Sequence, residues 1–111
     1  MPVPLHQAKA ELFRTLGHPV RVRVLELLQD GPRAVHELLD EIDVEPSNLS
    51  QQLAVLRRAG IVVAERDGST VRYSLAAHDV AELMLAARRF LTDILADRAE
   101  LLAELRAGTG A

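Results

Sequence analysis

Residues 46–75 read PSNLSQQLAVLRRAGIVVAERDGSTVRYSL, and most of the architecture follows from the pattern in this segment. Its first half carries Leu49, Leu53 and Leu56, which recur at helical spacing. A proline suits the first position of a helix, and a glycine commonly follows the last. The segment therefore predicts a helix over residues 46–59.

The second half of the segment changes to a period of two. Apolar and polar residues alternate over 61–66 and again over 69–75, as expected for strands that expose one face. Asp67 and Gly68 lie between them and form a strong hairpin-turn signal. A two-stranded hairpin is therefore predicted directly after the helix.

The flanking segments read mainly as helices. Apolar residues at helical spacing predict helices over 5–16, 34–42 and 78–106. The stretch after Pro19 alternates at first like a strand, but its length to residue 30 and the proline at its start favour a helix.

The element order predicts a single domain over residues 1–111 in the mainly α class with a β-hairpin (α+β), a winged helix-turn-helix. The helix-turn-helix occupies residues 34–59, the wing 61–75, and two further helices, 5–16 and 78–106, are assigned to dimerisation.

The predicted second helix of the helix-turn-helix has an outer face of serine, asparagine and glutamine, the side chains that hydrogen-bond base edges in the major groove. A solvated helix face is the alternative reading, and the adjoining hairpin favours DNA binding. The candidate DNA-binding residues of this helix and the wing are Ser47, Asn48, Ser50, Gln51, Gln52, Arg57, Arg58, Arg66, Ser69, Thr70 and Arg72.

The charge distribution supports this interpretation. The chain has a net charge of −3, which at face value argues against a nucleic-acid partner. Residues 47–75, however, carry four arginines against two acidic residues, whereas residues 29–46 carry one arginine against six. Acid is thus concentrated before the predicted reading helix, and the reading unit itself is positive.

Three segments together resemble the ArsR/SmtB family of bacterial repressors: residues 11–28, residues 47–62 (SNLSQQLAVLRRAGIV) and residues 66–75 (RDGSTVRYSL). The resemblance covers about residues 8–95. It implies a homodimeric winged-helix regulator, acting as a repressor, that binds double-stranded DNA at an imperfect palindrome and responds to an effector. The family often has histidine where this chain has Gln52, so the base preference of this chain is expected to differ from that of such members.

The predicted last helix supports dimerisation independently, because a small domain can cover only part of its apolar stripe. We expect it to pair with the first helix of a second chain, with a free-standing helix or a different partner protein as the alternative. The expected dimer residues are Leu5, Leu12, Val80, Leu83, Met84, Ala87, Leu91, Ile94 and Leu95.

The sensor that the family resemblance implies is missing. The chain has no cysteine, which removes disulfides, thiolate metal sites and thiol redox switching. The family's thiolate pair would align with Ala34 and His36, and its last-helix ligands would align near Ala77, Asp79 and Phe90, of which only Asp79 could bind a metal. The remaining hypothesis for a cofactor is a divalent effector metal, Ni²⁺ or Zn²⁺, bound by a three-residue set. This set comprises His6, His36 and Asp40.

Other classes of protein are less compatible with the sequence. An aromatic content of 3% is low for base stacking on single strands. Neither a catalytic cluster nor a glycine-rich phosphate loop is present, so no enzyme is expected. Without a signal peptide or membrane span, we expect a cytoplasmic location. Two alternatives remain: a protein-interaction module built on the same domain, and sensing by a separate co-regulator protein.

Overall fold

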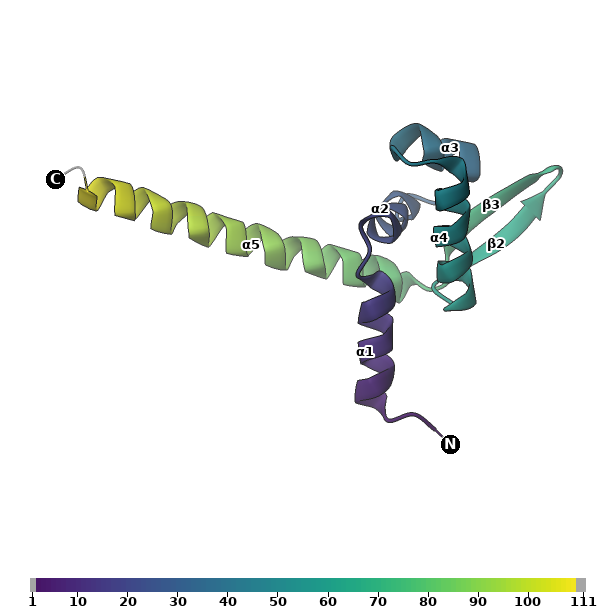
Figure 1. Cartoon of the computed structure of the whole chain (residues 1–111), viewed down its shortest axis with the longest axis horizontal. Coiled ribbons are helices and arrows are strands. Elements are labelled where there is room, and N and C mark those ends of the chain that lie inside the picture. The colour runs from purple at the N-terminus through teal and green to yellow at the C-terminus, as the bar shows by residue number, and fades with distance from the viewer. Residues whose placement is uncertain (1, 110–111) are drawn as a thin grey trace. The chain divides into compact units, whose positions relative to one another are not determined.

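The computed structural model describes residues 2–109 of the chain (Figure 1). A winged helix-turn-helix occupies its N-terminal three quarters, and a long helix ends it. The elements are α1 (Leu5–Leu16), α2 (Pro19–Leu28), β1 (Arg33–Ala34), α3 (Val35–Glu41), α4 (Pro46–Arg58), β2 (Val62–Asp67), β3 (Thr70–Leu75) and α5 (His78–Thr109).

Each predicted helix is present, with bounds that agree to within a few residues. The ambiguous segment after Pro19 is helical, and Pro19 occupies the first turn of α2. His18 caps that helix: its Nδ1 accepts a hydrogen bond from the backbone N–H of Val20 at 3.2 Å. The cap and the proline together explain why an alternating sequence forms a helix here.

The hairpin belongs to a three-stranded antiparallel sheet in the order β1-β3-β2. β1, which the sequence did not predict, pairs Arg33 with Tyr73 and thereby joins the start of α3 to the wing. Asp67 pairs with Thr70, so the turn consists of Gly68 and Ser69, one residue later than predicted. Gly68 has a φ of 65°, which fits a type II′ turn with glycine at its first central position.

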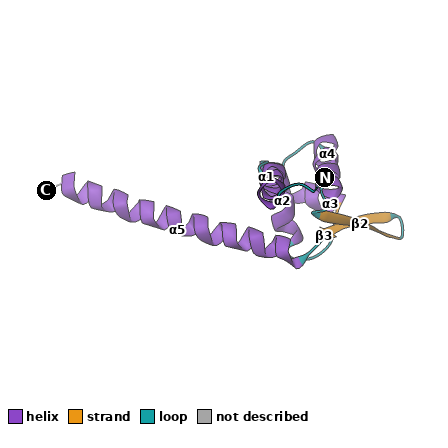
Figure 2. Cartoon of the chain, turned by 90° about the horizontal axis from the view of Figure 1, so that it is seen from below, coloured by secondary structure: helices purple, strands orange, loops and turns teal. Residues whose placement is uncertain are grey.

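Figure 2 shows β2 and β3 as a ribbon whose turn extends beyond the helices α3 and α4. The direction of this wing is set where α4 ends. Gly60 has a φ of 77°, and the N–H groups of Gly60 and Ile61 donate to the carbonyls of Arg57 and Leu56 at 3.0 Å each. This is a Schellman C-cap, in which the left-handed residue reverses the chain.

The core lies between α2, α3, α4 and the sheet. Its fully buried side chains come from each of these elements: Val24, Leu25, Leu38, Leu49, Leu53, Leu56 and Val62. The predicted leucine stripe of residues 46–59 is therefore the buried face of α4. α2 packs on α4, and α4 packs on β2, so the helix-turn-helix and the base of the wing share one core.

α5 forms a second compact unit from Glu82 onward. It is one helix of 32 residues, with several large apolar side chains exposed. No helix within residues 2–109 has the length and apolar character needed to cross a membrane.

Candidate nucleic-acid interface

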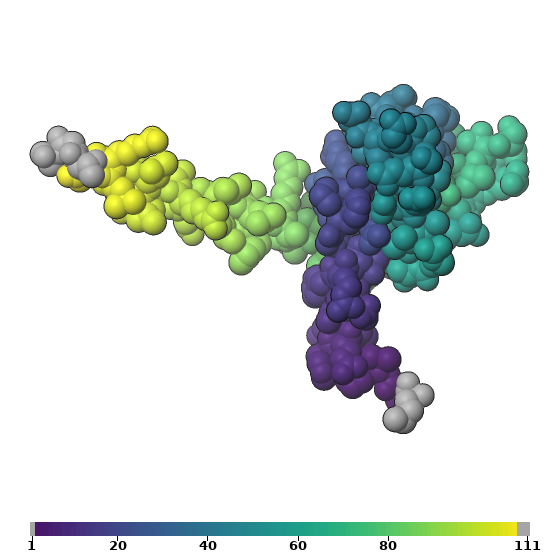
Figure 3. All heavy atoms as spheres, viewed as in Figure 1, coloured from purple at the N-terminus to yellow at the C-terminus, as the bar shows by residue number. Residues whose placement is uncertain are grey.

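The solvent face of α4 carries the candidate base-reading side chains. Leu49, Leu53 and Leu56 turn inward and fix the helix, which leaves the opposite side exposed. In Figure 3 the atoms of α4 lie at the surface beside those of the wing. The predicted residues that lie exposed on this face are Ser47, Ser50, Gln51, Arg57 and Arg58.

The N-terminus of α4 adds a partial positive charge to this face. Glu45 occupies the N-cap position, but its side chain makes no capping hydrogen bond. Pro46 has no N–H, so the backbone N–H groups of Ser47 and Asn48 are the ones available to an acceptor, and the helix dipole favours a negative group there. Phosphate oxygens meet both requirements.

The prediction that Gln52 lies on the outer face is wrong. Gln52 is only 9% exposed, and its side chain lies against α2. Gln52 Oε1 accepts a hydrogen bond from Arg21 Nε at 2.8 Å, and its Nε2 donates to Asn48 Oδ1 at 2.9 Å. Asn48 is half-buried at the edge of the exposed face. Gln52 therefore supports the reading face from below.

A shallow hollow lies between α4 and the wing. It is lined by Ser50, Ala54, Arg57, Arg58 and Tyr73. The two arginines make no ion pair within the described part of the chain. The hollow thus presents two uncompensated positive charges beside the reading helix, the arrangement that a DNA phosphate backbone requires.

The two wing arginines, both of them candidate DNA-binding residues, differ in their surroundings. Arg66 is exposed, and no ion pair within residues 2–109 involves it. Arg72 lies further from the tip and is half-buried, with its guanidinium between Glu37 and Asp67 at 3.2 and 3.7 Å. Ser69 is exposed in the turn, and Thr70 beside it is half-buried. Of the two wing arginines, Arg66 therefore has an uncompensated charge among the described residues, whereas the charge of Arg72 is compensated.

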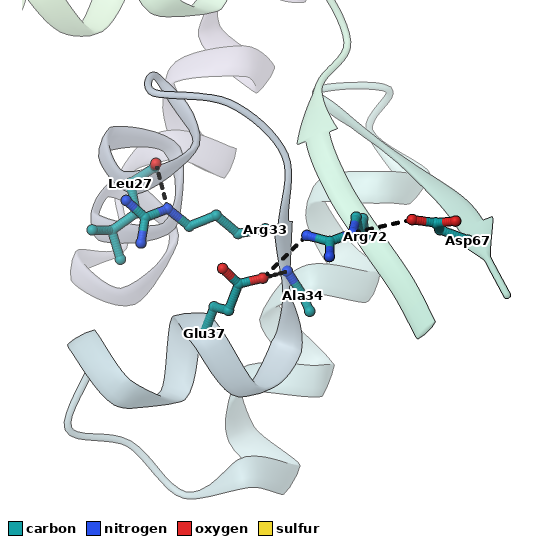
Figure 4. A network of polar contacts seen from close by, with 6 residues as sticks. All are labelled: Leu27, Arg33, Ala34, Glu37, Asp67 and Arg72. Atoms are coloured by element: carbon teal, nitrogen blue, oxygen red, sulfur yellow. Dashed lines mark hydrogen bonds and ion pairs between the residues drawn. The ribbon is translucent and has the colours of Figure 1, made fainter. Parts of the chain in front are cut away.

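Arg72 belongs to a polar network that connects the wing to α3 (Figure 4). Glu37 Oε1 accepts a hydrogen bond from the Ala34 N–H at 3.0 Å and another from Arg72 Nη1 at 3.2 Å. The bond from Ala34 lowers the pKa of Glu37, desolvation opposes this effect, and the charge of Arg72 adds to it. Arg33 Nε completes the network by donating to the carbonyl of Leu27 at 3.1 Å. The contacts hold the base of the wing on the helix-turn-helix.

The candidate metal ligands do not come together within one chain. His6, His36 and Asp40 are all exposed. Among residues 2–109, no group of three histidine, aspartate or glutamate side chains lies close enough to hold a metal ion. A site built from these three residues would need ligands from two chains.

The expected dimer residues lie on α1 and α5, and none of them is buried in the single chain. On α1, Leu5 is 69% exposed, and Leu12 and the neighbouring Phe13 are also exposed. On α5, Leu91 and Leu95 are 56% and 62% exposed. Val80, Leu83, Met84 and Ile94 are half-buried, and Ala87 is exposed.

Three contributors to the site were not predicted: Arg21, Glu37 and Tyr73. The position of Arg21 could have been inferred from the sequence. It precedes Val24, Leu25 and Leu28 by three, four and seven residues, which places it on the same helix face as these buried side chains of α2. An arginine in such a stripe requires a buried partner. Tyr73 pairs with Arg33 across two strands, and Glu37 of α3 contacts Arg72 of β3, and no local sequence pattern shows such contacts.

These features define a winged helix-turn-helix, the class of fold that places a helix in the major groove of DNA. Residues 18–63 match the family described as "Bacterial regulatory protein, arsR family". The chain is 55% identical over 109 residues to the uncharacterized HTH-type transcriptional regulator Rv0081 of Mycobacterium tuberculosis, covering 97% of this chain and 96% of that one. The crystal structure of Rv0081 superposes with a TM-score of 0.80 over 88% of this chain and 99% of that one.

Two further relatives extend the comparison. The HTH-type transcriptional repressor SmtB of M. tuberculosis is 41% identical over 78% of this chain and 64% of its own length. The homodimeric winged helix-turn-helix DNA-binding domain of Mb0332 from Mycobacterium bovis has a TM-score of 0.74 at 28% identity, covering 82% of this chain and 84% of that one. The chain belongs to the ArsR family of bacterial regulatory proteins. It is a transcriptional regulator with a DNA-binding winged helix, and not an enzyme.

Proposed function

We propose that the protein is a homodimeric repressor that binds a palindromic operator in double-stranded DNA. The observation that carries the proposal is the exposed polar face of α4, flanked by arginines that have no ion-pair partner among residues 2–109. Its start presents neutral hydrogen-bonding groups suited to base edges. Its end and the wing present Arg57, Arg58 and Arg66, which are suited to phosphates or to the minor groove.

The positions of the predicted residues support different roles in DNA binding for different groups of them. Ser47, Asn48 and Gln51, in the first two turns of α4, read bases. Ser50, with Arg57 and Arg58, lies toward the hollow and holds the backbone. Arg66, Ser69 and Thr70 form the wing contact. Arg72 and Gln52 act indirectly, by orienting the wing and the base-reading side chains.

Dimerisation supplies the second reading helix. A homodimer with two-fold symmetry places two copies of α4 against half-sites about one helical turn apart, which requires an inverted repeat. The exposed apolar residues of α1 and α5 supply the surface, and the relative Mb0332 is described as homodimeric.

The relative SmtB is described as a repressor, which supports repression, and not activation, as the role of this protein. A protein that acts on the chromosome of a bacterium works in the cytoplasm.

For the effector we retain the hypothesis of Ni²⁺ or Zn²⁺ at a site shared between subunits. His36 and Asp40 lie one turn apart on α3, a spacing that lets both side chains contact one ion, and His6 would come from the second chain. Calorimetric titration with each ion tests this hypothesis. The affinity of wild type should be lost in His36→Ala, and an equal affinity in the two proteins would refute the site. Sensing by a separate co-regulator protein is then the remaining explanation.

An electrophoretic mobility shift tests the DNA-binding proposal. Duplexes from the region upstream of the gene are titrated in the presence of excess unrelated duplex, with wild type and with Arg57→Gln/Arg58→Gln. We expect wild type to shift one fragment as a complex of two chains, and the double variant to bind it at least tenfold more weakly. Equal binding of related and unrelated duplexes would contradict sequence-specific regulation. Unchanged affinity in the double variant would contradict the assigned phosphate contacts.

A further inference from the structure

Beneath the exposed face of α4, three side chains form an uninterrupted row of hydrogen bonds. Arg21 of α2 donates from Nε to Gln52 Oε1 at 2.8 Å, and Gln52 Nε2 donates to Asn48 Oδ1 at 2.9 Å. The same guanidinium of Arg21 also donates from Nη1 to the carbonyl of Thr15 at 3.0 Å, which fixes its position. The row runs from the end of α1 to the first turn of α4.

The chemistry of arginine fixes the direction of every bond in this row. A guanidinium has donors only, so Gln52 must turn its amide oxygen toward Arg21. Its amide nitrogen then faces Asn48, which must in turn present an oxygen. Gln52 is 9% exposed, and a reversed amide would leave two donors facing each other without solvent. The row therefore permits one orientation of both amide groups.

The orientation of Asn48 has a consequence at the surface. Its oxygen points inward to Gln52, and no hydrogen bond within residues 2–109 uses its Nδ2. Asn48 occupies the third position of α4 and is half-exposed, so its amide NH₂ is the group available to a ligand. An asparagine that is free to turn can contact adenine through both its oxygen and its nitrogen. Here the oxygen is directed inward to Gln52.

We propose that Asn48 reads its base as a hydrogen-bond donor only, and that Arg21 and Gln52 are positioning residues that set this polarity. The proposal rests on the function proposed above, in which the start of α4 enters the major groove. The bases whose major-groove edges offer acceptors without an amino donor are guanine, through O6 and N7, and thymine, through O4. Asn48 is thus expected to select guanine or thymine and to disfavour cytosine.

The test begins by locating the base pair that Asn48 contacts. An operator selected from random DNA by wild type is varied one position at a time, and binding is measured by fluorescence anisotropy for wild type and Asn48→Ala. The variant should lose preference at one position of each half-site, where wild type prefers guanine or thymine. A uniform loss of affinity at all positions with a smaller salt dependence would indicate a phosphate contact and overturn the proposal.

Gln52→Glu then tests the positioning role. A carboxylate still accepts from Arg21, but its second oxygen also accepts, so Asn48 must turn its NH₂ inward and present its oxygen to the DNA. The preference at the same position should move toward cytosine or adenine, whose N4 and N6 amino groups donate. The affinity ratio between the old and new bases should change by about tenfold. Gln51→Glu is the control: it adds the same charge outside the row, so it should weaken binding yet keep guanine or thymine at that position. An unchanged preference in a folded Gln52→Glu protein would overturn the proposal.

A second measurement needs no change within the core. The acceptor of the preferred base is removed by an analogue, 7-deazaguanine or 2-aminopurine for guanine, or 5-methyl-2-pyrimidinone for thymine. Wild type should lose at least fivefold in affinity with one of these duplexes, and Asn48→Ala should be indifferent to all of them. Equal losses in both proteins would overturn the assignment of Asn48. If wild type binds no duplex specifically, the proposed function itself is refuted. If wild type binds specifically but the base preference does not depend on Asn48, only the inference about Asn48 is refuted.

Discussion

Truncation of Leu91 on α5 is expected to weaken dimerisation without unfolding the chain. Leu91 is 56% exposed in the single chain, so little more than half of its surface remains to be buried by a partner. Burying a whole leucine side chain is worth about 1.5–3 kcal/mol, and the remaining half about 1–1.5 kcal/mol. An isologous interface contains the residue twice, so Leu91→Ala should cost the dimer about 2–3 kcal/mol.

This cost corresponds to a dissociation constant of the dimer that rises about 30- to 150-fold, since about 1.4 kcal/mol is a factor of ten. Sedimentation equilibrium over a range of concentrations measures the change directly. Glu100→Ala is the matched control, because nine residues at about 100° each place Glu100 half a turn away from Leu91 on the same helix. It should leave the dissociation constant unchanged.

Circular dichroism should show the same helix content and the same melting of the monomer in both variants, since Leu91 makes no part of the buried core. Two results would refute the reasoning. One is a Leu91→Ala dimer as stable as that of wild type, which would place the interface elsewhere. The other is a wild-type protein that stays monomeric at every concentration.

Three further predictions concern the cap of α4, the wing network and the wing charge. Gly60→Ala should lower the free energy of unfolding by about 1–2 kcal/mol in thermal melts, because Gly60 has a φ of 77°; Gly108→Ala, within α5, should not lower it. The pKa of Glu37 is lowered in the folded protein, so its stabilising contribution is present above the ordinary value of 4.5 and is lost as the pH falls below it. Glu37→Gln should therefore be less stable than wild type at pH 7, and the two should converge in acid. Arg66→Gln should reduce the salt dependence of DNA binding by about one phosphate contact. Arg72→Gln should leave that dependence unchanged, because Glu37 and Asp67 already compensate this arginine; equal slopes for the two variants would contradict the distinction.

The helices and the main hairpin could be predicted from the sequence because apolar residues recur with a different period in helices and in strands. Leu49, Leu53 and Leu56 mark one face of α4, and alternation marks the wing. β1 could not be predicted in this way, since a strand of two residues has no pattern. It exists because Arg33 and Ala34 lie opposite Tyr73 and Arg72 in the folded sheet.

The prediction for Gln52 is wrong because its polarity suggests an exposed position, whereas its spacing indicates a buried one. Gln52 lies three residues after Leu49 and four before Leu56, which is a buried position of the stripe. Arg21 holds the equivalent place in α2. A polar residue in each of two buried stripes indicates that the two helices meet there and that the side chains pair. The sequence contains this signal, but only the structure identifies which partner each side chain has.

Selection of bound duplexes from a random library tests the central claim most directly, which is that two copies of α4 read a two-fold symmetric DNA site. The account predicts enrichment of an inverted repeat whose half-sites are centred about one helical turn apart, as two reading helices on one face of the duplex require. A library that remains unenriched after repeated rounds, or an enriched single half-site without symmetry, would contradict it.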